Sequence, residues 1–377
     1  MRRVIIESMG AYEAARRHLE GEPVAWRTTS PGLLALLSTR GENVASPEDG
    51  LSLLEQDAVG KASYDFALAA SNLLDERCTW RSYASMGAVF GLALAQLAHV
   101  FFYKGLLLHR VLEEYPDGVL CVGSSAVTPV VELNIGVGRF DTLYALLAQN
   151  MELRGLDVLE YVEDTSRLEA MDAWVNDRRM GGWEKLLSLC TNTPSSFAYK
   201  LWRALESRGL LRRVRLRFKP RKQLFVYKDC ELIQEAFLGL LGRGAELTRL
   251  PALPSPKVGC VNSKDMPKGI ELVSELEALC VQVTRNRGLP QGRALAAACS
   301  VIASRIGCAA ARLRVVLPEM DVSFGRIAAT MGPRGVVISN FFTSPVERLF
   351  GLWCRKHQVP VVAFEHGITL GLSDWAA

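Results

Sequence analysis

The sequence lacks paired metal-ligand motifs and low-complexity tracts. Its nine cysteines are scattered singly, with no CxxC motif and no histidines at metal-ligand spacing. This pattern argues against a zinc site and favours free thiols in a reducing compartment. Charged residues make up 22% of the chain and hydrophobic residues 49%, which excludes an intrinsically disordered protein. We therefore expect a globular protein without a bound metal.

The chain also lacks a recognisable secretion signal. Its start, MRRVIIES, is basic and then apolar, but the apolar run is too short for a signal-peptide core. We predict that this segment is a first β-strand and that the protein is cytoplasmic. The formal net charge is only +4, so any surface that binds anions must be local. With 377 residues, the chain can form two domains, or one domain with a sizeable insertion.

One segment, residues 82–103, has no charged side chain. Within it, residues 86–103 are numerous enough to span a bilayer as a helix. Gln96 and His99 near the middle argue against insertion, and no second span is evident. Two interpretations stay open: a helix buried in a large α/β domain, or a segment inserted in a membrane. For the same reason a peripheral position at the inner face of the cell membrane stays open.

The pattern of apolar runs predicts an α/β protein with a doubly wound, Rossmann-like parallel sheet and a substantial helical insertion. Residues 1–165 are predicted to form the N-terminal part of the sheet. Residues 166–290 are predicted to form a helical and basic insertion, with a proline-rich linker at 250–268. Residues 291–377 are predicted to close the same sheet. The strands expected in the N-terminal part are 3–8, 23–28, 118–122 and 157–162.

A short turn follows the predicted strand 118–122. Gly123, Ser124 and Ser125 could present backbone N–H groups and hydroxyls to a phosphate or sugar at the start of the next helix. The turn lacks the spacing of a Walker loop. A plain strand-to-helix connection is the alternative interpretation. We retain these three residues as candidates for substrate binding.

The stretch 208–222 is strongly basic, with eight Lys or Arg among its fifteen residues and none acidic. Arg213, Arg215, Arg217 and Lys219 alternate with apolar residues, which on a strand places four cations on one face. Such a strand could be a solvated edge that resists aggregation. It could also bind anionic lipid head groups or phosphorylated sugars. Nucleic acid is a weaker candidate partner, because no nucleic-acid module is recognisable.

The closing segment predicts a strand at 336–338, a helix over 345–357 and a buried strand at 361–364. A further strand is predicted at 314–317. These three strands are expected to be parallel neighbours in one sheet. Asn340 follows the strand 336–338 and joins the residues expected to bind substrate.

Glu365, His366 and Gly367 come directly after the last predicted strand, where ligands bind in open α/β sheets. A histidine at this place can titrate near neutral pH and transfer protons. Glu365 could orient the imidazole or act as a base. We predict that both are catalytic and that Gly367 contacts substrate. A lone histidine with a structural role is the alternative.

The strand–helix–strand that ends in Glu365-His366-Gly367 resembles a segment of bacterial GT-B glycosyltransferases. The similarity is to enzymes of surface polysaccharide, capsule and teichoic-acid assembly, at the boundary after their first domain. It covers about the last 65 residues and a loose N-terminal strand pattern. Glu365 stands where the family more often has glutamine.

The resemblance implies two Rossmann-like domains with a cleft between them, in which His366 and Gly367 lie. It also implies a nucleotide-sugar donor as substrate, a glycan or lipid-linked acceptor, and no metal or other cofactor. In the family a second domain follows this turn, whereas the sequence ends ten residues later at Ala377. The chain is therefore expected to be either part of a longer enzyme or a form without an intact donor site.

The leading prediction from the sequence is the acceptor-side domain of a glycosyltransferase that acts on a surface-glycan precursor. The alternative is a non-catalytic, membrane-associated protein of polysaccharide assembly that uses the basic stretch and the apolar helix. Whether the isolated chain is an active enzyme stays open at this point.

Overall fold

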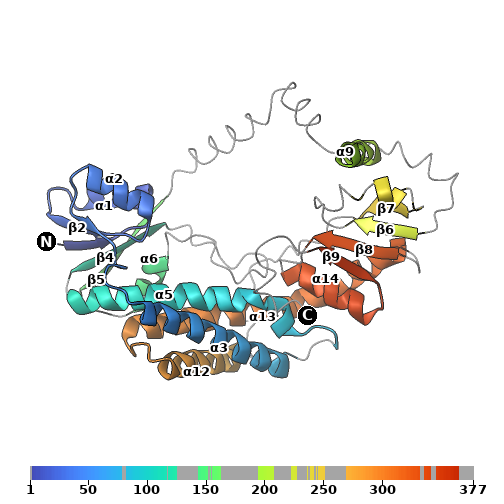
Figure 1. Cartoon of the computed structure of the whole chain (residues 1–377). Helices are drawn as coiled ribbons and strands as arrows, with labels where there is room; N and C mark the ends of the chain where they lie inside the picture. Colours follow the sequence, from blue (N-terminus) through green and yellow to red (C-terminus); the bar gives the residue numbers. More distant parts are fainter. Residues whose placement is uncertain are drawn as a thin grey trace. The chain divides into compact units, whose positions relative to one another are not determined.

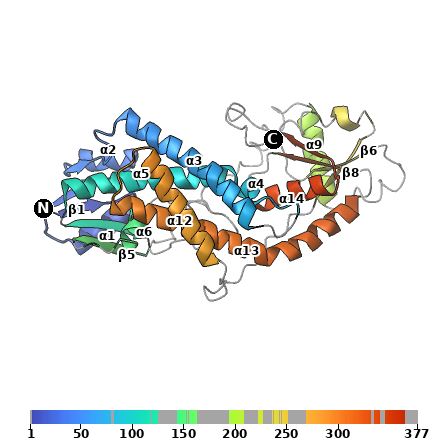
Figure 2. The ribbon, with the colours of Figure 1, turned by 90° about the horizontal axis from the view of Figure 1, so that it is seen from below.

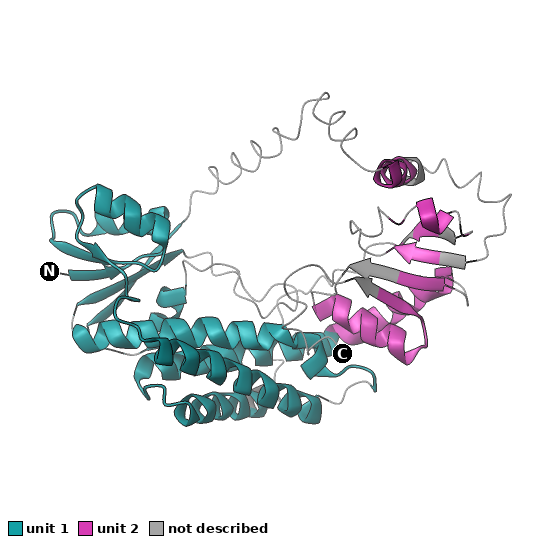
Figure 3. Ribbon diagram, viewed as in Figure 1, with its two compact units in different colours: residues 1–163, 257–315 teal, residues 164–256, 316–377 magenta. Residues whose placement is uncertain are grey.

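A computed structural model of the chain describes residues 2–78, 82–116, 118–124, 143–151, 155–162, 194–207, 222–226, 238–241, 245–250, 269–331, 335–340 and 345–364, with the single positions 153, 236 and 243. The described residues form two compact units (Figure 3). Unit 1 comprises Met1–Glu163 and Lys257–Val315, and unit 2 comprises Asp164–Pro256 and Val316–Ala377. Each unit is described separately.

Unit 1 contains the elements β1 (Arg2–Ile5), α1 (Met9–His18), β2 (Val24–Arg27), α2 (Pro31–Thr39), β3 (Val44–Ala45), α3 (Leu53–Arg77), α4 (Met86–Phe90), α5 (Leu92–Glu114), β4 (Val119–Ser124), α6 (Leu143–Gln149), β5 (Leu156–Tyr161), α12 (Gly269–Asn286) and the first part of α13 (Arg293–Met331) (Figure 1). Its strands form one parallel sheet in the order β3-β2-β1-β4-β5. The order therefore reverses between β1 and β4. The four strands predicted for this part of the chain are confirmed, and β3 was not predicted.

The core of unit 1 explains why these strands read as continuous apolar runs. Val4 and Ile6 pack with α1 and α2 on one face of the sheet. Ile5 and Cys121, which point to the opposite face because side chains alternate along a strand, are also buried. Figure 1 shows α1 and α2 on one side of the sheet and α5 and α6 on the other. Helices thus cover both faces, which is typical of parallel sheets.

The apolar segment 82–103 forms two helices, α4 and α5, separated at Gly91. Gly91 has φ +37°, a value in the left-handed region that suits glycine. Helix α5 contacts α3, and α3 contacts α12; Figure 2 shows these helices in one layer. Helices α5 and α13 are long and apolar enough to cross a membrane, but 56% and 67% of their most apolar windows are buried in the fold. A core helix passes the same test, so length and composition do not decide between the two interpretations.

Unit 2 contains α9 (Pro194–Ser207), β6 (Lys222–Val226), β7 (Ala245–Arg249), the last part of α13, β8 (Gly335–Asn340), α14 (Pro345–Lys356) and β9 (Val361–Phe364). Its strands form a second parallel sheet in the order β7-β6-β8-β9. The prediction that 336–338 and 361–364 are parallel neighbours is confirmed, since Val337 pairs with Val361.

The predicted strand at 314–317 is wrong, because these residues lie inside helix α13. Leu313, Val316, Leu317 and Met320 are all buried and recur at i, i+3, i+4 and i+7. This spacing lines one face of a helix, so packing along α13 overrides the β propensity of the two valines. Pro318 also lies within α13.

The closing strands belong to a sheet of their own rather than to the sheet of β1. The expectation of one sheet is therefore replaced by two sheets, and β6 and β7 supply the partners of β8. Both of these strands come from the region expected to be helical and basic. The confirmed part of the fold prediction is the coarse one, an α/β protein with parallel sheets.

Candidate functional site

The carboxyl ends of the strands in unit 1 meet at one edge of the sheet, and polar residues follow them there. Glu7 comes after β1, Thr29 after β2 and Glu48 after β3, while Ser124 ends β4 and Tyr161 ends β5. In open parallel sheets this edge binds ligands where the strand order reverses, here between β1 and β4. We use the name carboxyl-edge cluster for six of the residues at this edge: Glu7, Thr29, Glu48, Tyr103, Lys104 and Tyr144.

Glu7 is the centre of this cluster. Its Oε1 accepts a hydrogen bond from the backbone N–H of Thr29 at 3.0 Å, and its Oε2 accepts one from the Thr29 hydroxyl at 2.5 Å. The Glu7 side chain is only 7% exposed. A buried carboxylate requires such donors, because burial without them disfavours its charged form.

Lys104 supplies the matching positive charge from helix α5. Its Nζ lies 3.4 Å from Glu7 Oε2 and also donates to the Thr29 hydroxyl. The same Nζ lies 4.7 Å from the centre of the Tyr144 ring, a cation–π arrangement. Burial lowers the pKa of Lys104, and the Glu7 carboxylate offsets part of this effect. The pair connects α5 to the turns that follow β1 and β2.

Tyr144, at the start of α6, has a buried hydroxyl with no hydrogen-bond partner among the described residues. Its side chain is 1% exposed. Burial, followed by the negative charges of Glu7 and other groups, raises the pKa of Tyr144 well above its ordinary value. A buried hydroxyl left unpaired costs about 1–3 kcal/mol. Among the described residues the Ser71 hydroxyl is also buried without a hydrogen-bond partner, but Tyr144 is the one that lies in the carboxyl-edge cluster.

The outer part of the cluster is formed by Tyr103 and Glu48. The Tyr103 hydroxyl donates to Glu48 Oε1 at 2.9 Å. Burial and this hydrogen bond raise the pKa of Tyr103 to about 12. Glu48 is exposed, Tyr103 is partly buried and Tyr144 is fully buried. The cluster therefore extends from solvent into the interior of unit 1.

The start of helix α1 is not an open anion site. Ser8 caps the helix by accepting from the Ala11 N–H, and its hydroxyl also lies 2.8 Å from that of Tyr161. A Cβ on Gly10 would come within 2.8 Å of the Tyr161 ring. Tyr161 thus covers this helix end, and glycine at position 10 permits the close contact.

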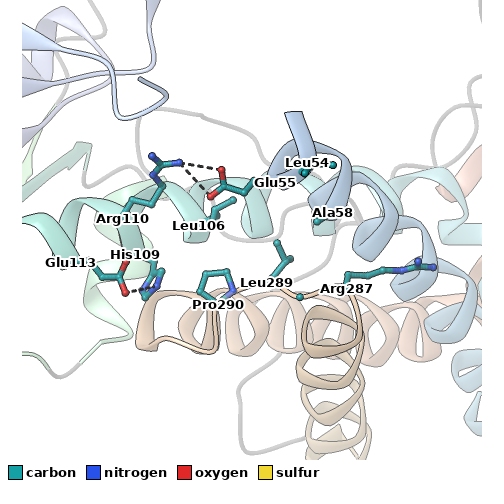
Figure 4. Close-up of a pocket in the computed structure, with 11 residues that line it drawn as sticks. Leu54, Glu55, Ala58, Leu106, His109, Arg110, Glu113, Arg287, Leu289 and Pro290 are labelled. Carbon is teal, nitrogen blue, oxygen red and sulfur yellow. Dashed lines mark hydrogen bonds and ion pairs between the residues drawn. The ribbon is translucent and has the colours of Figure 1, made fainter. Parts of the chain in front are cut away.

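A second feature of unit 1 is an open depression of about 440 Å³ lined by α3, α5 and the turn between α12 and α13 (Figure 4). Apolar and charged side chains both line it. Its charged groups pair with each other or with neighbours: Arg110 with Glu55, His109 with Glu113, and Arg287 with Asp65. Since these charged groups already have partners, none of them requires a polar ligand in the depression.

Only part of the sequence-predicted site can be located. Gly123 and Ser124 end β4 and are buried, and β4 pairs directly with β1, so both lie at the edge that holds the cluster. Asn340 ends β8, and its backbone pairs with Phe364 of β9. The other candidates lie outside the described residues: Ser125, Arg213, Arg215, Arg217, Lys219, Glu365, His366 and Gly367.

The sequence analysis missed Glu7, Lys104 and Tyr144. One signal was available for Lys104, which is the only charged residue between Arg81 and Arg110 in a long apolar stretch. A lone charge in an apolar helix requires a buried partner. The identity of that partner was not predictable, because Glu7 is 97 positions away in the sequence.

Within the described ranges, no three His, Cys, Asp or Glu side chains are grouped so that they could hold a metal ion. Comparison of the chain with protein-family models, with curated proteins and with solved structures gives no match.

Proposed function

We propose that this chain is a glycosyltransferase that uses a nucleotide-activated sugar, and that unit 1 binds a surface-glycan precursor as acceptor. The observation that carries the proposal is the carboxyl-edge cluster, where charged and hydroxyl groups gather at the reversal of strand order in a parallel sheet. Sugars are bound by such sets of convergent donors and acceptors in otherwise apolar surroundings.

The two sheets give the proposal further support. The order β3-β2-β1-β4-β5 is that of a Rossmann-like sheet, and β7-β6-β8-β9 reverses in the same way between β6 and β8. A glycosyltransferase of the GT-B type has two Rossmann-like domains. Both sheets have the strand order of such domains, although folds of this kind also serve many other functions.

The catalytic roles in this proposal fall to the segment that follows β9. His366 would transfer a proton or contact the donor, and Glu365 would orient its imidazole. Gly367, Asn340, Ser125 and the last residues of β4, Gly123 and Ser124, would contact substrate. The nucleotide-sugar donor is a substrate, so the proposed reaction uses no cofactor.

The alternative is a non-catalytic protein that assembles polysaccharide at the membrane. The apolar helices α5 and α13 favour it by length and composition, but more than half of each apolar window is buried in the fold. The cluster at the sheet edge has no part in that alternative. We therefore place the transferase first, in the cytoplasm or at the inner face of the cell membrane.

The proposal is tested by incubating the purified chain with radiolabelled nucleotide sugars and with extracted lipid-linked glycan precursors. The expected result is transfer of label to the glycan from one donor, reduced roughly 10²–10⁴-fold by His366→Ala. A chain that transfers no label but binds anionic liposomes would support the assembly protein instead.

A further inference from the structure

The hydroxyl of Tyr144 contributes nothing visible to the fold. It is buried and unpaired, whereas the ring packs well and lies beside Lys104 Nζ. A phenylalanine would fill the same space without an unsatisfied group. A polar group kept at such a cost indicates a partner that is not part of the described chain.

Lys104 has hydrogen-bonding capacity beside this hydroxyl. An ammonium group carries three N–H donors. Within the described residues, its hydrogen bonds use two acceptors, Glu7 Oε2 and the Thr29 hydroxyl. A ligand oxygen placed between Lys104 and Tyr144 would satisfy a third donor and the Tyr144 hydroxyl together.

The charges around this point select the class of ligand. Glu7 Oε2 lies 3.4 Å from Lys104 Nζ, and Glu48 accepts a hydrogen bond from Tyr103 in the same cluster, so the cluster holds two carboxylates and one ammonium group. A phosphate or nucleotide would meet a net negative environment, which disfavours it. A neutral hydroxylated ligand avoids that repulsion and can donate to, or accept from, the groups present.

We propose that Tyr144 and Lys104 form a subsite for a hydroxyl group of a neutral sugar. The sugar belongs to the acceptor glycan, an assignment that rests on the proposed function. The phosphates of the donor bind elsewhere. Tyr103 and Glu48, joined by a hydrogen bond, form the more exposed part of the same cluster, and this is the side from which the sugar would approach.

The test is isothermal titration of the full chain with galactose and N-acetylglucosamine as neutral probes, and with UDP and inorganic phosphate as anionic probes. Tyr144→Phe removes only the hydroxyl. It should weaken binding of the neutral probe about tenfold, the effect of one hydrogen bond in a desolvated site. The melting temperature should stay unchanged or rise, because the variant removes an unsatisfied group.

Tyr12→Phe is the matched control. The Tyr12 hydroxyl is also largely buried, but it donates to Glu42 Oε1 at 2.8 Å. Its removal should lower the melting temperature and leave sugar binding unchanged.

Three outcomes would overturn the subsite: no neutral probe binds, Tyr144→Phe binds sugar as the wild type does, or phosphate competes with sugar for Tyr144. Failure of the transferase proposal is recognised separately. Sugar binding that depends on Tyr144 without any transfer of label would keep the subsite and reject the enzyme. Transfer of label that is unchanged in the Tyr144→Phe variant would keep the enzyme and reject the subsite.

Discussion

At the scale of single residues, the pair of Lys104 and Glu7 is the most deeply buried ion pair among the described residues of unit 1. Both side chains are largely buried, with 10% and 7% exposure. Removal of one partner from a buried ion pair leaves an uncompensated charge, which costs far more than the pair itself contributes. The pair therefore holds the turns after β1 and β2 in place, and neither residue can be replaced alone without penalty.

We predict that Lys104→Met lowers the free energy of unfolding by roughly 3–5 kcal/mol, because the Glu7 carboxylate is left buried without its cation. The double variant Glu7→Gln with Lys104→Met should recover a large part of the loss. Urea denaturation followed by circular dichroism measures both. A single variant within about 1 kcal/mol of the wild type would mean that solvent screens the pair, as at an exposed site.

Because the pKa of Tyr103 is raised in the folded chain, we predict that the chain loses stability at high pH. Its pKa is about 12 in the folded chain, raised by burial and by the Glu48 carboxylate, against an ordinary value of 10.0. Between these values the unfolded chain binds fewer protons than the folded chain, so stability falls as pH rises from 10 to 12. Tyr103→Phe should make this decline shallower in thermal melts across that range. An unchanged decline in the variant would exclude Tyr103 as its source.

At the scale of elements, the packing of α5 on α13 depends on a glycine. A Cβ on Gly105 would lie 3.1 Å from Leu295 Cδ1 and 3.2 Å from Ala298 Cβ. We predict that Gly105→Leu lowers the free energy of unfolding by roughly 1–3 kcal/mol, the usual cost of overpacking.

Gly60→Ala on α3 is the control for the Gly105 prediction, because nothing lies within 4 Å of its added Cβ. It should stabilise the chain by about 0.5–1 kcal/mol through helix propensity alone. Denaturant melts of the two variants give the comparison. A stabilising Gly105→Leu would show that α5 and α13 do not pack closely.

The helices and strands also differ in how well the sequence predicted them. Strands β1, β2 and β4 were recognisable from short apolar runs, which are typical of strands covered by helices on both faces. Strand β5 was recognisable although it lies at the edge of the sheet and exposes Asp157 and Glu160. The segment 314–317 was misassigned, because its valines favour a strand locally while the buried face of α13 requires a helix. Strand β6, with the sequence KQLFV, begins at the end of a basic stretch and gave no clear signal.

The functional cluster was less predictable than the strands. The sequence predicted Gly123 and Ser124 in a turn after a strand that ends at residue 122, whereas both are the last, buried residues of β4. The contacts of Lys104 join residues 75 and 97 positions apart, and no local pattern encodes such pairs. Parallel topology brings these residues together, so they are evident only once the strand order is known.

At the scale of the whole molecule, the account assigns catalysis to His366 and acceptor binding to unit 1. In an active preparation, His366→Ala should reduce turnover roughly 10²–10⁴-fold, the usual contribution of a general acid or base. The melting temperature should barely change. A lowered melting temperature, with activity lost only through unfolding, would identify His366 as a structural residue.

The central claim is that the ligand of unit 1 binds at the carboxyl-edge cluster. Hydrogen–deuterium exchange of the full chain, with and without saturating N-acetylglucosamine, tests it most directly because it locates binding along the sequence. The account predicts slower exchange in the turns that follow β1 and β2 and at the start of α6, with no change in the turn between α12 and α13. Protection confined to that turn and to the adjoining parts of α3 and α5, which line the depression in Figure 4, would contradict it.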